Sequence, residues 1–444
     1  MRGRALLPPL ALLLLAGACT RPPRATLDPA RTFQALQRSV PLPAGDLATA
    51  LTTVAWQDHP DLALARAELE TARAGILTAR ARPNPAFGFG ATRTEGSSPR
   101  PWTLTYGLTI PVELGGKRRL RIRQAELRVQ AAQLGVADTA WNLRMQVRRA
   151  LVDWRQAREA ASLADESAAL WTRLLALQDR RLALGEIAAP ERAATAQSAG
   201  QAQAARLAAQ EALRRAEASL ALASGVPAST LAPRLAAEPP PDLALAAPPA
   251  PPPTEALLHR LDIRQVLLDW DRNETTLDQE LAQRVPDLQL GPGYTFDQGA
   301  ERWVLGFSVD LPVFDRRQGP IAEALARRKV IQARLRQAET RDLAGATLAE
   351  ARLAAAREAL GTQRQSLRDA EVRLAVARRS LALGGSSRGS LIAAELEVNQ
   401  ARRLALDAWA EAERARLAVE AAFQKPLDPS ERPYVLDAQP GARP

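Results

Sequence analysis

The sequence predicts a mostly helical protein with a small β part, in which long antiparallel helices carry two β-hairpins. Three observations lead to this prediction. The chain repeats itself at a spacing of 201 residues, so that Trp102 recurs as Trp303. Each copy contains segments in which apolar and polar residues alternate, as in strands. Each copy also contains a long run without proline, in which leucine recurs at helical spacing. Because aromatic residues make up only 4% of the chain, long helices are favoured over a compact mixed core.

The first residues have the pattern of a bacterial lipoprotein leader. Met1–Arg4 carries two positive charges, Ala5–Ala16 is apolar, and small residues precede Cys19. The apolar run is shorter than the roughly 20 residues that a membrane-spanning helix needs. We therefore predict a signal peptide over residues 1–18 and a covalent lipid on Cys19, with Thr20 permitting sorting to the outer membrane. The alternative is an ordinary leader cleaved nearby, which would leave Cys19 as a free thiol.

The duplication divides the rest of the chain into two units. The segment Trp102–Val112 aligns with Trp303–Val313, and Leu182–Gly185 aligns with Leu381–Gly384. A stretch with two runs of three prolines separates the copies, and these prolines cannot lie inside a helix. The predicted divisions are an N-terminal extended segment over 19–46, a first repeat over 47–225, an extended Pro-rich linker over 226–253, a second repeat over 254–426 and a C-terminal tail over 427–444.

Two segments of each repeat are predicted to form a hairpin. In Trp102–Val112 and its copy, apolar residues face one way and polar or small residues the other, over about the length of a membrane-spanning strand. The weaker partner strands are predicted over 86–93 and 288–297, and short polar loops join each pair. The apolar faces predict contact with membrane lipid. The predicted lipid-facing residues are Trp102, Leu104, Tyr106, Leu108, Trp303, Leu305, Phe307 and Val309.

These hairpins cannot complete a fold within one chain. A soluble sandwich is the alternative, but the sequence supplies only four predicted strands and no second sheet to cover the apolar face. Four strands also cannot close a membrane barrel, since the smallest barrels have about eight. Closure therefore requires several chains, and two chains would supply eight strands while three would supply twelve.

The long helices have an unusual apolar pattern. Residues 116–184 contain no proline, and two series of apolar residues recur there every seven residues, offset from each other by two. An offset of two places the series about 200° apart around a helix, which suits a helix with neighbours on both sides, as in a cylinder wall. About 68 residues would span roughly 100 Å. Shorter helices, about 47–82 and 190–224 in the first repeat, could run antiparallel alongside it.

The remaining composition points away from catalysis, resident metals and nucleic acid. The net charge is +10, but the basic residues are spread along every predicted helix, which favours solvated helix faces over a nucleic-acid stripe. The two histidines, His59 and His259, do not occupy matching repeat positions, and no cluster of metal ligands is visible. The Gly115–Arg118 run lacks the full phosphate-loop pattern. We predict no enzyme activity and no cofactor other than the lipid on Cys19.

Taken together, these features resemble the outer-membrane efflux protein (TolC-like) family over essentially the whole mature chain. The motifs Ile110–Arg118 and Leu311–Gly319 are similar to those of its cobalt–zinc–cadmium resistance branch. The resemblance implies a lipid-anchored homotrimer in the outer membrane, with a 12-stranded transmembrane β-barrel and a trimeric α-barrel extending into the periplasm. It also implies a passive exit duct for heavy-metal cations, served by a periplasmic adaptor and an inner-membrane resistance–nodulation–division type pump. The alternatives are a channel for drugs or exported proteins, or a periplasmic coiled-coil scaffold without a pore.

The resemblance also assigns candidate residues at the turns between the long and short helices. These turns would form the periplasmic entrance and contact the adaptor. The residues that match the adaptor-contacting tips are Leu184, Gly185, Glu186, Leu383, Gly384 and Gly385. Three carboxylates nearby, Asp179, Glu186 and Glu191, are candidates for an entrance constriction, and the alternative is that they are ordinary solvated helix charges.

Overall fold

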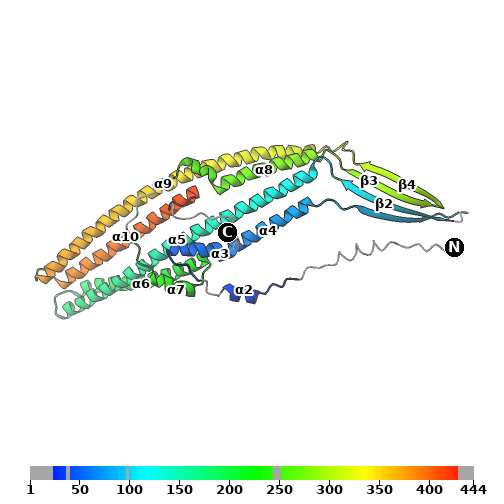
Figure 1. The fold of residues 1–444 in the computed structure, drawn as a ribbon. Helices are drawn as coiled ribbons and strands as arrows, with labels where there is room; N and C mark the ends of the chain where they lie inside the picture. Colours follow the sequence, from blue (N-terminus) through cyan, green and yellow to red (C-terminus); the bar gives the residue numbers. More distant parts are fainter. Residues whose placement is uncertain (1–23, 37–40, 97–99, 244–251, 429–444) are drawn as a thin grey trace.

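The computed structural model describes residues 24–36, 41–96, 100–243 and 252–428. The molecule is elongated, with the strands at one end and the turns between the long helices at the other (Figure 1). Cys19 and the predicted signal peptide lie outside the described residues. No helix in the described part of the chain is both long and apolar enough to cross a membrane.

The two repeats have the same order of elements. The first comprises α3 (Leu47–Asp58), α4 (Pro60–Arg80), β1 (Ala86–Arg93), β2 (Trp102–Val112), α5 (Lys117–Ala183) and α6 (Ala189–Ser224). The second comprises η2 (Thr254–His259), α8 (Leu261–Ala282), β3 (Leu288–Asp297), β4 (Ala300–Val309), α9 (Gln318–Ala382) and α10 (Arg388–Phe423). The prediction of a mostly helical chain with one small antiparallel β part is thereby confirmed.

Three local features differ from the predictions. The segment predicted as extended before residue 47 contains α2 (Pro29–Leu36), whose first turn is capped by Asp28. The segment predicted as an extended linker contains α7 (Ala228–Ala237), because Leu231 and Leu235 are buried against the first repeat. The helix predicted over 47–82 is broken into α3 and α4 at Pro60, which begins α4 and cannot continue a preceding helix.

The long helices dominate the architecture. Helix α5 has 67 residues and α9 has 65, whereas α6 and α10 have 36 each. Helices α4 and α6 both pack along α5, and α8 and α10 both pack along α9 (Figure 1). Helix α5 also contacts α8 and α10, so it joins the two repeats along nearly their whole length.

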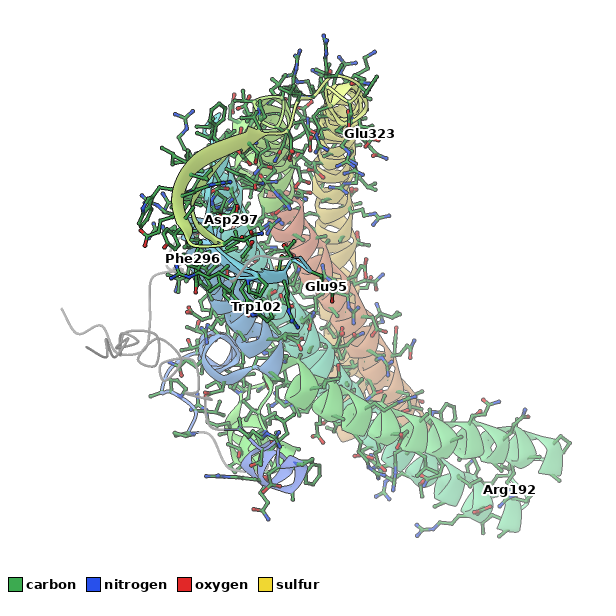
Figure 2. All side chains as sticks on the ribbon, turned by 90° about the vertical axis from the view of Figure 1, so that its right-hand side faces the viewer. Glu95, Trp102, Arg192, Phe296, Asp297 and Glu323 are labelled. Carbon is green, nitrogen blue, oxygen red and sulfur yellow. The ribbon has the colours of Figure 1, made fainter. Side chains whose placement is uncertain are left out.

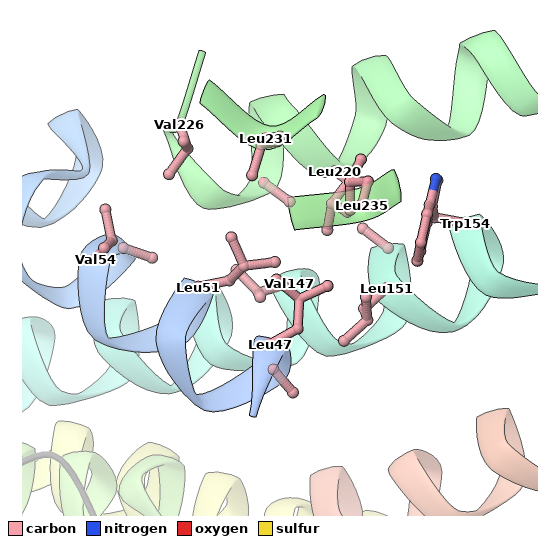
Figure 3. Close-up of a cluster of buried hydrophobic side chains, with 14 residues drawn as sticks. Leu47, Leu51, Val54, Val147, Leu151, Trp154, Leu220, Val226, Leu231 and Leu235 are labelled. Carbon is pink, nitrogen blue, oxygen red and sulfur yellow. The ribbon is translucent and has the colours of Figure 1, made fainter. Parts of the chain in front are cut away.

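The two apolar stripes of α5 serve different neighbours. One side contributes Val147, Leu151 and Trp154 to a cluster with α3, α6 and α7 (Figure 3). Another side contributes Met145 and Val152 to a cluster with α9 and α10. The core is therefore a series of small clusters along the rod, because each helix segment buries side chains against a different neighbour.

The four strands form one antiparallel sheet in the order β1-β2-β3-β4. The hairpins β1–β2 and β3–β4 belong to separate repeats, and β2 pairs with β3 where the repeats meet. Strands β1 and β4 are the two edges of this sheet.

Candidate functional surfaces

The strand register places all eight predicted lipid-facing residues on one face of the sheet. Tyr106 lies opposite Phe89 on one side and Tyr294 on the other, and Tyr294 lies opposite Trp303. Because directly paired residues share a face and alternate residues follow them, the remaining predicted residues of β2 and β4 lie on this same face. We call it the apolar face. The role predicted for it, contact with lipid, stays a prediction.

The apolar face carries a continuous row of aromatic rings. The ring centroids of Phe89 and Tyr106 are 5.2 Å apart, those of Tyr106 and Tyr294 are 6.2 Å apart, and those of Tyr294 and Trp303 are 4.9 Å apart. These separations lie within the range of favourable aromatic contacts. The row crosses all four strands and thus both repeats.

The opposite face of the sheet is mostly small or polar, with Val304 among the exceptions. It carries Gly88, Gly90, Thr103, Thr105, Gly107, Gly291, Gly293, Thr295, Gly306 and Ser308. On the apolar face, by contrast, Trp303 and Leu305 are each 81% exposed. The sheet projects beyond the helices, as Trp102 and Phe296 show near its far end (Figures 1 and 2). Among the described residues nothing covers this apolar surface, and exposed patches of this kind are typical of sites that contact a membrane or another protein.

At the other end of the molecule, the turn between α5 and α6 is a tight helix terminus. Gly185 has a φ of 74°, and its N–H donates to the Leu182 carbonyl at 3.0 Å. The Glu186 N–H donates to the Arg181 carbonyl at 2.9 Å. This pair of bonds is the Schellman arrangement, in which glycine takes the left-handed conformation and satisfies the last helical carbonyls.

The turn between α9 and α10 repeats this arrangement. Gly384 has a φ of 75°, and its N–H donates to the Leu381 carbonyl at 3.1 Å. The Gly385 N–H donates to the Ser380 carbonyl at 2.9 Å. The six predicted tip residues therefore form two turns of the same construction, and both turns lie at the end of the molecule remote from the strands (Figure 1).

Each tip presents one large apolar side chain to solvent. Leu184 is 74% exposed and its repeat counterpart Leu383 is 81% exposed. Each leucine is the C-terminal cap of its long helix, directly before the glycine that ends the helix. Adaptor contact at these residues stays a prediction.

The three predicted constriction carboxylates all lie at the first tip. Asp179 accepts a hydrogen bond from Arg192 at 2.7 Å, which joins α5 to α6, and Glu186 forms an ion pair with Arg181 at 3.2 Å. Glu191 lies in the first turn of α6, where a carboxylate favours the helix start. These contacts give two of the three a partner within their own hairpin. The constriction role stays a prediction.

The two histidines lie on different elements of the fold, His59 directly before α4 and His259 in η2. His59 caps α4, and its Nδ1 accepts the Asp61 N–H at 3.2 Å. His259 is the last residue of η2. Within the described ranges, no group of three or more histidine, cysteine and carboxylate side chains is arranged to hold a metal ion.

Sequence reasoning missed the contacts that join the repeats inside the bundle. Glu420 on α10 accepts hydrogen bonds from Arg144 on α5 at 2.6 Å and from Arg416 at 2.9 Å. The buried amide of Asn399 donates to the Leu163 carbonyl at 3.0 Å. Arg144 and Glu420, like Leu163 and Asn399, are separated by more than two hundred positions, and local periodicity carries no signal for such pairs.

Comparison with known proteins shows which family this chain is similar to in sequence. Residues 51–226 match the model of the family described as outer membrane efflux protein. The cobalt-zinc-cadmium resistance protein CzcC of Cupriavidus metallidurans is 30% identical over 276 residues, which cover 60% of this chain and 62% of CzcC. The match to this relative therefore spans less than two thirds of its length.

Solved outer-membrane proteins share the fold. The outer membrane protein VceC from Vibrio cholerae has a TM-score of 0.68 at 20% identity, with 86% of this chain and 97% of VceC covered. The outer-membrane channel OprN has a TM-score of 0.71 at 18% identity, with 86% and 90% covered. CusC has a TM-score of 0.67 at 16% identity, with 85% and 91% covered. The resemblance predicted from the sequence is thereby confirmed: the chain is similar in sequence to the outer membrane efflux proteins and has the fold of the TolC-like channels.

Proposed function

We propose that the protein is the outer-membrane channel component of a tripartite efflux pump. It would act as a passive exit duct for substrates that an inner-membrane transporter passes on through a periplasmic adaptor. The observation that carries the proposal is the single sheet with an uncovered apolar face, at one end of a rod whose other end is formed by two matching helix turns. A lipid on Cys19 would anchor the chain to the same membrane.

The internal repeat supports closure by further copies of the chain. Strand β2 of the first repeat pairs with β3 of the second. The equivalent pairing between copies joins β4 of one chain to β1 of the next, which removes both free edges. Two copies would give eight strands, whose interior is filled by side chains, whereas three give twelve and leave room for a pore. The proposed assembly is therefore a homotrimer with a 12-stranded barrel.

Exposed apolar residues on the helices fit the same assembly. Leu406 on α10 is 1% exposed because it packs against α5, whereas its repeat counterpart Leu207 on α6 is 56% exposed. On α9, the helix equivalent to α5, Val372 and Val376 are each 63% exposed. The contact of α5 with α10 inside one chain corresponds to a contact of α9 with α6 of the next copy. The exposed residues lie on the two helices that this contact would join.

The proposed cargo is heavy-metal cations, on the strength of the similarity to a cobalt-zinc-cadmium resistance protein. The cations would pass through the duct as substrate, with selectivity supplied by the pump and the adaptor. The two tips, with Leu184 and Leu383 exposed to solvent, would receive the adaptor at the periplasmic end.

Loss of the gene is expected to lower growth on zinc, cobalt or cadmium while leaving tolerance to a panel of drugs unchanged. The measurement is growth of the deletion strain across a concentration series, with the wild-type gene restored as a control. If the deletion strain were sensitive to drugs alone, the protein would instead be assigned to the alternative class, the drug channels. Unchanged tolerance to every compound, in a strain without a second homologue, would count against efflux altogether.

Two neighbouring residues on β4 test the membrane role of the sheet. Leu305 lies on the apolar face and Val304 on the opposite face. Leu305→Arg is expected to destabilise the inserted barrel by about 2 kcal/mol, because an arginine would face lipid. Val304→Arg is expected to have a smaller effect, because it would face the interior. The measurement is the fraction of heat-modifiable trimer in isolated outer membranes, and equal loss in both variants would contradict the assigned orientation.

A further inference from the structure

A recess of about 410 Å³ lies in the helical part of the molecule, over α8 and between α5 and α9. It is distinct from the sheet and from the tips. The lining residues that matter for its chemistry are Gln124, Asp269, Arg272, Asn273, Arg327 and Arg334. Figure 1 shows these three helices side by side in the part of the rod next to the strands.

The charge of the recess is unbalanced. It contains three arginines and one carboxylate, and that carboxylate, Asp269, already pairs with Arg272 at 3.3 Å. Arg327 and Arg334 are solvent-exposed, and they form no hydrogen bond or ion pair with any described residue. Seven residues separate the two arginines, so they lie on one face of α9. The recess thus holds two uncompensated cations.

Two buried polar atoms in the recess also lack partners. Nε of Arg272 and Oε1 of Gln124 are inaccessible and accept or donate no hydrogen bond within the described structure. The Nε2 of Gln124 donates to the Thr276 hydroxyl at 3.3 Å, which fixes the amide on the wall of the recess. The end of the Arg272 guanidinium remains accessible, since the side chain is 37% exposed, so this group can still contribute positive charge to the recess.

The duplication provides an internal comparison. At the spacing of 201 residues that relates the strands and the helix ends beside them, the counterparts of Arg272, Arg327 and Arg334 are Thr71, Glu126 and Gln133. The first repeat therefore forms the same helices without any of the three arginines. Packing of the fold does not require them, and their convergence in the second repeat needs another reason.

We propose that this recess binds an oxyanion of the phosphate class. The planar guanidinium group of arginine matches phosphate oxygens with paired, charge-assisted hydrogen bonds. Arg327 and Arg334 would each donate paired hydrogen bonds to the anion, the exposed end of the Arg272 guanidinium would add positive charge, and Asn273 would line the recess without charge. The phosphate could be a free anion or part of a lipid headgroup. The two arginines lie roughly 14 and 24 Å along α9 from its first residue, so a free anion fits their depth below the strands better.

The test is calorimetric titration of the purified full-length protein at low ionic strength. One arm uses inorganic phosphate and pyrophosphate, and the other uses phosphatidylcholine vesicles with and without phosphatidylglycerol. The test variant is Arg327→Gln with Arg334→Gln. The matched control is Arg336→Gln with Arg352→Gln, which removes the same charge from exposed positions of the same helix outside the recess. Circular dichroism confirms that both variants are folded.

Binding is expected in the wild type, and the test variant is expected to weaken it by about tenfold or more, with the control close to wild type. Such a loss in the phosphate arm identifies a free anion, and a loss confined to the vesicle arm identifies a lipid headgroup. Absence of binding in both arms, or equal weakening in the control variant, would overturn the proposal. Neither result depends on whether the protein acts in efflux, so the two proposals fail separately.

Discussion

Glu420→Ala is expected to lower the free energy of unfolding by about 3–5 kcal/mol, because it removes one partner of a buried ion pair. The Glu420 side chain is 1% exposed and accepts hydrogen bonds from Arg144 at 2.6 Å and Arg416 at 2.9 Å. The Arg144 side chain is equally inaccessible, at 2%. The pair joins α5 of the first repeat to α10 of the second, so its loss weakens the contact between the two repeats.

The surroundings of Glu420 make its removal costly. Burial, followed by the positive charge of Arg144, lowers the pKa of Arg148 to about 10. Positive charge is therefore already disfavoured at this point, and Glu420 is one of the groups that offset it. Without the carboxylate, the Arg144 guanidinium stays buried next to two further cations, Arg148 and Arg416.

Urea denaturation followed by circular dichroism, at one fixed protein concentration, measures the effect. The control is Glu397→Ala, because Glu397 forms an exposed ion pair with Arg373 and its loss is expected to change stability by less than about 1 kcal/mol. Replacing Arg144 and Glu420 together with methionine is expected to be less damaging than Glu420→Ala alone, since the buried guanidinium of Arg144 is removed with its partner and Arg416 keeps its ion pair with Glu413. Equal midpoints for Glu420→Ala and Glu397→Ala would refute the expected cost.

The features of this protein that could be predicted from its sequence are those set by residues close together in the chain. Alternation with a period of two identified β2 and β4. The apolar series on α5 indicated neighbouring helices on two sides, and these neighbours pack against α5 in the clusters that contain Trp154 and Met145. The tips were predictable because glycine at position 185 or 384 ends a helix in the left-handed conformation, and this preference belongs to the residue itself.

Other features depend on contacts between distant segments. Helix α7 forms although Pro233 lies inside it, because Leu231 packs against the cluster on α5. The choice of Glu420 as the partner of Arg144 cannot be read from a chain with so many arginines and carboxylates. The arginine recess is likewise invisible in sequence, because Arg272 and Arg327 meet only through the packing of α8 on α9. Comparison of the two repeats could have drawn attention to it.

The second large effect is expected at the turn that joins β2 to α5. Gly115 and Gly116 both have positive φ angles, 67° and 73°, so a side chain at either position is strained by about 1–2 kcal/mol. Their surroundings differ. A Cβ on Gly115 would lie 3.0 Å from the carbonyl oxygen of Ala282 and 3.1 Å from Cβ of Val285. A Cβ on Gly116 would have only a flexible arginine end near it, at 3.9 Å.

Gly115→Ala is therefore expected to destabilise the protein by about 2–5 kcal/mol, the sum of backbone strain and overpacking, whereas Gly116→Ala is expected to cost only about 1–2 kcal/mol. The close contact lies where the strands of the two repeats leave the helices. There Asp287 accepts the Leu114 N–H at 3.0 Å and the Lys117 ammonium at 2.8 Å. Displacing Gly115 from Ala282 would shift β2 against β3 and disturb the sheet that must close between copies.

The measurement compares the two alanine variants by urea denaturation and by the fraction of heat-modifiable trimer. We expect Gly115→Ala to lose both stability and trimer, and Gly116→Ala to lose a little stability with its trimer intact. Because the two positions share their backbone conformation, the difference between the variants isolates the contact with Ala282 and Val285. If both variants behaved alike, the close approach of the repeats at Gly115 would have no part in holding the sheet in register.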